Sequence, residues 1–166
     1  MNATSPGQAF LERAAHLLLT SLGKIREAVQ LLPEDEIWSR PNEASNSIGS
    51  LLLHLSGNVR QHVIGGLTGA PDTRDRPAEF STQGGRKKAE LLALLESTVA
   101  EAVAAIRAFP PARLLEEAHI QGKTVRLLDD LFTIVEHFGY HAGQIVLIVK
   151  AATSHRFPWY RHLDPQ

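Results

Sequence analysis

The chain has 166 residues, of which 43% are hydrophobic and 21% are charged, a composition typical of a single soluble globular domain. Its formal net charge of -1 provides no overall field for a nucleic acid or an anionic membrane, and no apolar run is long enough to span a bilayer. The absence of cysteine excludes disulfides, thiolate metal ligands and a cysteine nucleophile, and with no export signal evident at the N-terminus we expect a cytoplasmic protein.

Four segments have the periodicity of amphipathic helices, and none shows the alternation of a β-strand over a useful length. The first is residues 6–32, in which apolar side chains recur every three or four positions. Ser5 can cap its N-terminus, Pro6 suits the first helical position, and Pro33 ends the helix.

The other three predicted helices follow in order along the chain. The second spans residues 47–67; its first residue is a serine that can cap it, and a cluster of glycines ends it. The third spans residues 87–108 and is ended by Pro110–Pro111. The fourth spans residues 125–152, with Thr124 as a possible N-cap.

The fourth helix is apolar over most of its circumference, which is typical of a helix at the centre of a bundle. Gly139 and Gly143 lack side chains and would let a neighbouring helix approach closely. Residues 70–86 and 111–123 form long connections of a kind that often serve as lids or binding loops, and the second should contain a short helix and a Gln121–Gly122 turn. The pattern predicts an all-α fold, a four-helix bundle with crossover loops.

The strongest candidates for chemistry are three histidines. His137 and His141 are four residues apart in a helix, so both imidazoles lie on one face and can reach one ion at ~2.0–2.1 Å. Such pairs are often surface residues, but here they fall in the most apolar helix, where each would otherwise need its own hydrogen-bond partner. His54 alone would be interpreted as a core-edge histidine; it becomes a ligand candidate because the pair lacks a third donor. Three imidazoles leave a coordination position open, as in catalytic zinc sites.

Three further residues are candidates for general acid or base. His62 lies two turns beyond His54 and could line the same cavity, although simple packing is the alternative. Asp130 shares a helix face with His137 and could support a ligand imidazole or stabilise the helix N-terminus. Glu136 precedes a candidate ligand but points about 100° away from it.

Two amides are candidates for a cofactor-binding or substrate-binding pocket. Asn58 lies one helical turn after His54, and Gln144 lies seven residues after His137, near the same stripe. Neither residue has a spacing that requires a ligand role, so both are predicted only as polar groups lining the site.

Two segments of the chain resemble the DinB-like (DinB/YfiT-like) superfamily of metalloenzymes, and are closest to a branch without an assigned activity. They are IWSRPNEASNSIGSLLLHLSGNVRQHV, residues 37–63, and VEHFGYHAGQIVLIVK, residues 135–150. The resemblance covers nearly the whole chain. It implies a four-helix bundle of up-down-down-up topology, often dimeric. It also implies a metal site to which His54, His137 and His141 correspond, with zinc or nickel as the usual ion.

The resemblance implies two classes of enzyme, and a role without catalysis is a third possibility. Some members of the superfamily resemble thiol S-transferases that act with low-molecular-weight thiols such as bacillithiol, or isomerases that use mycothiol. We prefer a thiol-dependent S-transferase acting on a small molecule, with the thiol supplied from outside because the chain has no cysteine. A metal-dependent hydrolase is the first alternative and would need a base among Asp130, Glu136 and His62. A metal-binding or interaction bundle without enzymatic activity is the second.

Overall fold

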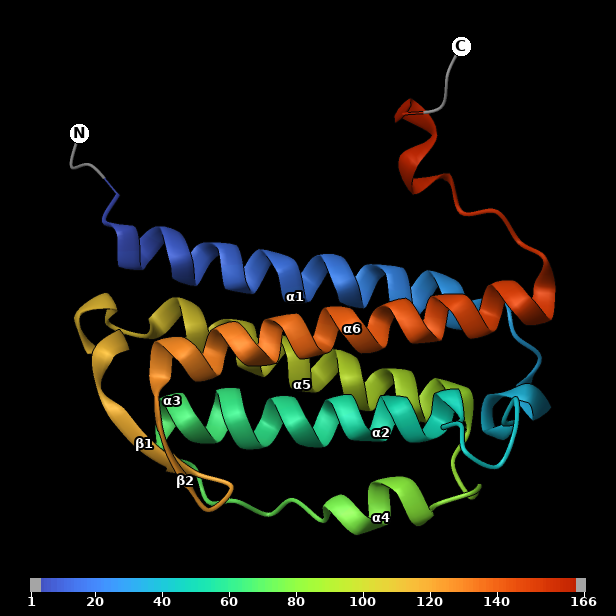
Figure 1. The fold of residues 1–166 in the computed structure, drawn as a ribbon, viewed down its shortest axis with the longest axis horizontal. Helices are drawn as coiled ribbons and strands as arrows, with labels where there is room; N and C mark the ends of the chain where they lie inside the picture. The colour runs from blue at the N-terminus through green and yellow to red at the C-terminus, as the bar shows by residue number, and fades with distance from the viewer. Residues whose placement is uncertain (1–3, 164–166) are drawn as a thin grey trace.

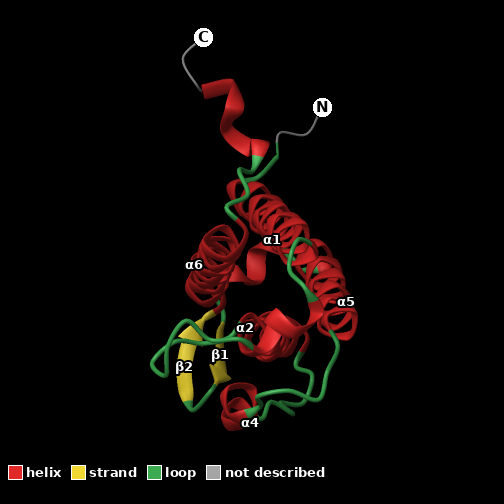
Figure 2. Ribbon diagram, turned by 90° about the vertical axis from the view of Figure 1, so that its right-hand side faces the viewer, coloured by secondary structure: helices red, strands yellow, loops and turns green. Residues whose placement is uncertain are grey.

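The computed structural model describes residues 4–163 of the chain. Four long helices form a bundle (Figures 1 and 2). Their bounds are Pro6–Gln30 for α1, Ile48–Val59 for α2, Lys88–Ala108 for α5 and Leu127–Thr153 for α6. The chain of α2 continues through a π-helical segment, Arg60–Gly65, into the short α3, Gly66–Thr68, and the three pieces form one rod.

The order and direction of the helices are those of an up-down-down-up bundle. In Figure 1, α1 and α6 run in one direction and α2 and α5 in the other. Helices α1 and α2 do not share a main interface; each of them packs against both α5 and α6. The end view in Figure 2 accordingly shows the four helices at the corners of a square. The predicted all-α four-helix bundle of up-down-down-up topology is therefore confirmed.

Shorter elements fill the connections. They are the 3₁₀ helices Glu34–Trp38, Pro111–Leu115 and Pro158–Leu163, the helix α4 at Arg76–Ser81, and the strands β1 at Glu117–Ile120 and β2 at Lys123–Arg126. Helix α4 packs against α2, so the long connection between the second and third long helices returns to the bundle instead of extending into solvent.

Two of the predicted helix starts are confirmed by their hydrogen bonds. The hydroxyl of Ser5 accepts from the backbone N–H of Gln8, and that of Ser47 accepts from the backbone N–H of Ser50, each at 3.1 Å. Such caps satisfy donors that have no partner within the helix. The N-terminal ends of α1 and α2 are therefore fixed by local sequence.

The start of α6 differs from the prediction. The helix begins at Leu127, and Thr124 is not its cap but a residue of β2, paired with His119 of β1. The hairpin forms because Gln121 and Gly122 have φ values of 51° and 75°, the left-handed backbone that a tight two-residue turn requires. The predicted turn and short helix in this connection are confirmed. The strands themselves are four residues long, too short to produce a recognisable alternation.

The prediction for the glycines of the fourth helix was wrong. A Cβ atom at Gly139 or Gly143 would meet no atom within 4 Å, because both lie on the exposed stripe of α6. Close approach occurs instead on α2, where a Cβ at Gly49 would lie 2.7 Å from the ring of Trp38. The indole is therefore in contact with the backbone of α2 and fixes the 3₁₀ helix Glu34–Trp38 against it.

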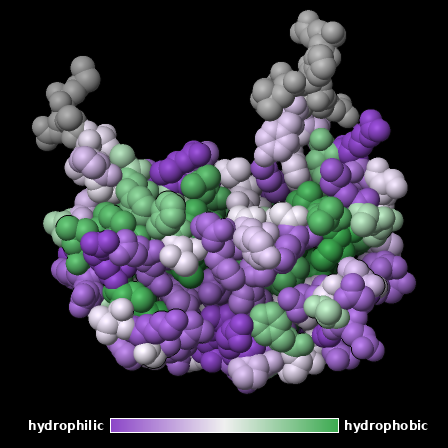
Figure 3. All heavy atoms as spheres, viewed as in Figure 1, coloured by the Kyte–Doolittle hydropathy of each residue, from purple (hydrophilic) through white to green (hydrophobic). Residues whose placement is uncertain are grey.

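The surface seen in Figure 3 is mostly hydrophilic, with apolar patches over α1 and α6. Several large apolar side chains of the molecule are exposed, among them Phe132, Tyr140 and Leu147 of α6. None of the helices in the described part of the chain is long and apolar enough to cross a membrane.

Candidate metal centre

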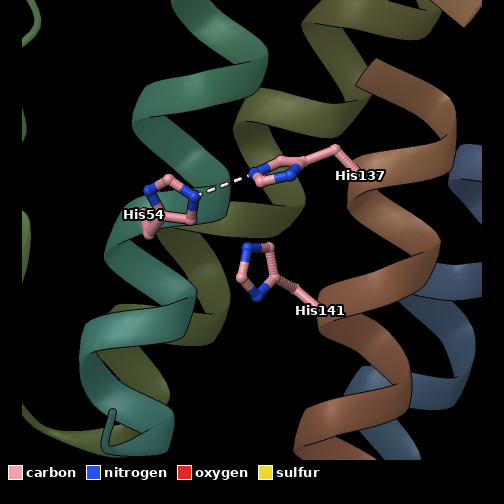
Figure 4. A group of neighbouring side chains, drawn as sticks. All are labelled: His54, His137 and His141. Atoms are coloured by element: carbon pink, nitrogen blue, oxygen red, sulfur yellow. Dashed lines mark hydrogen bonds between the residues drawn. The ribbon is translucent and has the colours of Figure 1, made fainter. Parts of the chain in front are cut away.

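The three predicted histidines meet between α2 and α6 (Figure 4). His54 comes from the middle of α2, and His137 and His141 from successive turns of α6. Each offers one ring nitrogen to a group in which these atoms all lie within 4.8 Å of one another. The closest pair is His54 Nε2 and His137 Nε2, at 2.9 Å.

The spacing of these nitrogens suits a transition-metal ion. A tetrahedral ion with nitrogen ligands at ~2.0–2.1 Å holds those nitrogens roughly 3.3 Å apart. This separation lies between the shortest distance in the group, 2.9 Å, and the 4.8 Å within which all three nitrogens lie. His54 and His141 are buried, and His137 is half-buried. The three histidines thus form a largely buried group, open on the side of His137, that can hold a metal ion.

The orientation of His54 is set by an acidic residue from α4. Its Nδ1 lies 3.0 Å from Glu79 Oε2, and the carboxylate also accepts from Arg74 Nε at 2.7 Å and Arg74 Nη2 at 2.8 Å. Burial raises the pKa of Glu79, but its hydrogen bonds with Arg74 and His54 lower it more, so its pKa lies below the ordinary value. Arg74 Nη2 also lies 3.1 Å from His54 Nδ1. In the tautomer in which Nδ1 donates to this carboxylate, which can only accept, the Nε2 lone pair of His54 faces the other histidines.

His141 has a similar outer partner. Its Nδ1 lies 2.7 Å from Gln144 Oε1, an acceptor one turn further along α6. The proton on Nδ1 again leaves Nε2 as the nitrogen with a free lone pair. Gln144, which was predicted as a polar group lining the site, thus contacts one of the three clustered histidines.

The environment keeps the histidines of α6 neutral. Burial, followed by the nearby charges of His141 and His54, lowers the pKa of His137 from 6.5 to about 4. Burial also lowers the pKa of His141, against the opposing effect of the hydrogen bond that His141 donates to Gln144. Neutral imidazoles are the form that binds metal ions, so protons compete little for these two ligands near neutral pH.

Two of the three acid or base candidates form a pair of their own. His62, in the π-helical segment, has its Nδ1 3.0 Å from Asp130 Oδ1 at the start of α6. Asp130 therefore supports His62 and not one of the three clustered histidines. The charge of His62 makes the last of the contributions that lower the pKa of His137, after those of burial, His141, His54 and Arg74.

The remaining two candidates lie in different surroundings. Asn58 is buried one turn from His54, and its Oδ1 has no hydrogen-bond partner among the described residues. Glu136 is exposed and lines a groove of about 360 Å³ between α1 and α6, together with residues such as Phe10 and Phe132. Glu136 therefore faces away from the three histidines.

Arg74 and Glu79 are the site residues that the sequence analysis missed. Both lie in the connection 70–86, which was predicted only as a possible lid or binding loop. One signal was present: Asp75 followed by Pro77 is the pattern of a helix start, and the Asp75 side chain does accept from the backbone N–H of Ala78 at 3.1 Å. That signal predicts a short helix there, but not that the helix folds back onto His54.

Comparison with known proteins gives two results. Residues 5–161 match the model of a family described as "Protein of unknown function (DUF1572)". The crystal structure of a DinB-like protein, YjoA, from Bacillus subtilis is similar, with a TM-score of 0.68 and 18% sequence identity. The match covers 89% of this chain and 96% of that chain, so it supports the fold over nearly its whole length. No curated protein matches.

Proposed function

Since this chain belongs to the DUF1572 family of proteins of unknown function, we propose that it is a metal-dependent enzyme whose His54, His137 and His141 hold one divalent transition ion, zinc or nickel. The observation that carries the proposal is the outer contact on two of the imidazoles. Glu79 and Gln144 each occupy an Nδ1 and leave the Nε2 atom for the centre of the group. Metal-ligating histidines are held in this way in general, whereas three clustered imidazoles without an ion need another explanation.

The reaction that we propose is the transfer of a low-molecular-weight thiol to a small electrophilic molecule. A bound divalent ion would supply a Lewis-acid centre that lowers the pKa of a thiol or of water. The chain itself would orient the reactants. Neutral imidazole ligands preserve the charge of the ion, and the half-buried side of His137 leaves access for a small molecule. The exposed ring of Tyr140 lies edge-on to that of His141, with the two centroids 5.2 Å apart.

Hydrolysis is a second candidate, and the pair of His62 and Asp130 favours it. Asp130 accepts a hydrogen bond from His62 Nδ1, so His62 Nε2 retains a lone pair that can accept a proton from water or from a thiol. The same pair can therefore serve either reaction. A bundle that binds metal without turnover is the remaining alternative.

The first experiment is elemental analysis of protein from which every affinity tag of histidines has been removed. We expect about one zinc or nickel per chain, and loss of that metal in the variant His137→Ala/His141→Ala with its circular dichroism spectrum unchanged. The matched control is His16→Ala/His119→Ala, which removes two exposed histidines outside the cluster and should keep the ion. A wild-type protein that takes up no metal even after reconstitution would overturn the proposal.

The second experiment distinguishes the reactions. The metal-loaded protein is mixed with small thiols and electrophiles, and consumption of each is followed. Thiol-dependent consumption of the electrophile supports transfer, thiol-independent cleavage of esters or amides supports hydrolysis, and neither result would favour the bundle without turnover.

We also propose that the protein is a cytoplasmic homodimer, as the resemblance to the DinB-like superfamily implies. The exposed apolar side chains Phe132 and Leu147 of α6, which are 64% and 67% exposed, support a contact on this helix. Light scattering after size-exclusion chromatography should give the mass of two chains, and Phe132→Arg should reduce it to one. A wild-type mass of one chain would contradict the dimer.

A further inference from the structure

We propose that Glu79 is the positioning residue of the metal centre, and that metal binding is coupled to the docking of the segment 72–81 on α2. This inference depends on the proposed metal site, and it concerns a part of the chain to which no ligand role has been assigned. Helix α4 delivers two side chains to His54: the carboxylate of Glu79 to Nδ1, and the ring of Phe80, whose centroid lies 4.9 Å from that of the imidazole. The orientation of one ligand thus depends on a separate segment.

The segment is held against α2 and the π-helical segment by polar contacts, among which the ion pair of Arg74 and Glu79 is buried. Arg74, whose side chain is 3% exposed, donates to both oxygens of Glu79 and, through Nη1, to Gln61 Oε1 at 2.8 Å. Gln61 in turn donates to Asp72 Oδ2 at 2.7 Å. Arg74 and Glu79 neutralise each other, so loss of either partner would leave a buried charge uncompensated. The carboxylate therefore has little freedom to leave His54.

Gly57 provides the space for this ion pair. A Cβ atom at Gly57 would lie 2.0 Å from Glu79 Oε1 and 3.2 Å from Arg74 Nε. A glycine in the interior of a helix costs about 1 kcal/mol relative to alanine, and its presence here is explained by the approach of the carboxylate. The clash involves the far end of a flexible side chain, so an added methyl group should displace the carboxylate and leave α2 intact.

Coupling follows from these contacts. If the docked segment orients His54 for the ion, the ion in turn favours the docked segment by the same factor, because linkage between two equilibria is reciprocal. Outer partners of this kind change metal affinity by about 10- to 100-fold when they are removed. The same range is expected for Glu79.

The experiment uses the full-length chain and Zn²⁺ in competition with a chelator. The variant Gly57→Ala should bind Zn²⁺ about 10- to 100-fold more weakly than wild type, still at one ion per chain. Gly23→Ala is the matched control: it makes the same change within α1, where an added Cβ meets nothing within 4 Å, and should bind as wild type does. Glu79→Gln, which keeps an acceptor but removes the charge, should also weaken binding.

Hydrogen exchange supplies the readout that a merely structural role would not change. In wild type, Zn²⁺ should slow amide exchange in residues 76–82, and in Gly57→Ala this protection should be largely lost. Wild-type affinity in both Gly57→Ala and Glu79→Gln, or exchange in residues 76–82 that Zn²⁺ leaves unchanged in wild type, would overturn the inference. Those results leave the metal site itself intact, whereas a wild type that binds no Zn²⁺ would refute the proposed function instead.

Discussion

The folded and unfolded chains bind a proton at His137 with different affinity. The pKa of His137 is about 4 in the folded chain and near 6.5 in an unfolded one, so between these values the unfolded chain holds more protons. Stability then rises with pH through this window and falls on acidification. The lowered pKa of His141 acts in the same direction.

We therefore expect the urea midpoint of the metal-free protein to fall as the pH is lowered from about 6.5 to about 4. The variant His137→Gln/His141→Gln should have a clearly shallower dependence, because its folded state no longer excludes these protons. His16→Gln, which changes an exposed histidine, is the control and should keep the wild-type slope. An equal slope in the double variant would show that other groups control the acid sensitivity.

Individual residues of the site differ in how far the sequence predicts them. His137 and His141 can be paired from their spacing alone, because the helix fixes their relative position. His54 could be selected only because the pair on the fourth helix lacks a third donor, or because of the family resemblance. Glu79 could not be predicted, because its contact with His54 depends on the path of an irregular connection across 25 residues, which no periodicity encodes.

At the scale of elements, the π-helical segment Arg60–Gly65 lies where the sequence predicts an ordinary helix. His62 belongs to this segment, and it was considered as a residue that could line the cavity of His54, with simple packing as the alternative. Eight positions of an ideal helix already turn the side chain of His62 about 80° away from that of His54. In the structure His62 pairs with Asp130 of α6. The segment RQHVIG has no feature by which the sequence would predict a π-helical turn.

The contact between Trp38 and Gly49 gives a prediction about the docking of a short element. In Gly49→Ala the new methyl group would meet three ring carbons of Trp38 at 2.7–2.8 Å, and a rigid indole cannot move as a flexible side chain does. Overpacking of this kind typically costs about 1–3 kcal/mol. We expect a lower urea midpoint and altered tryptophan fluorescence. Gly23→Ala, in open space on α1, should be neutral or stabilising, and an equally stable Gly49→Ala would contradict the tight contact.

At the scale of the whole molecule, the bundle has a core that does not depend on an ion. All four long helices contribute buried apolar residues, including Leu18 of α1, Leu52 of α2, Leu95 of α5 and Phe138 of α6. The number, order and direction of these helices could be anticipated, since their caps and apolar stripes are local features and the topology followed from the family resemblance. The hairpin could not, because its strands of four residues are too short to show an alternation, and the docking of α4 could not, because it depends on contacts between distant segments.

Removal of the metal should therefore leave the fold intact. We expect a chelator to strip the ion without loss of helical signal. Saturation at 100 times the Kd should add about 2.7 kcal/mol of stability, which raises Tm by roughly 5–10 °C for a chain of this size. The variant His137→Ala/His141→Ala should show no such shift. If chelation unfolded the wild-type protein, the ion would be structural instead.

The up-down-down-up connectivity also bears on the kinetics of folding. His54 and His137 are 83 residues apart in the chain. The chain must pass through α5 before it reaches α6, the helix that packs beside α2. Contacts of such long range form late, because the entropy of closing the loop must be overcome first. An ion that needs all three histidines would thus bind after the rate-limiting step of folding. Its stabilisation would then lengthen the lifetime of the folded state and leave the rate of folding almost unchanged.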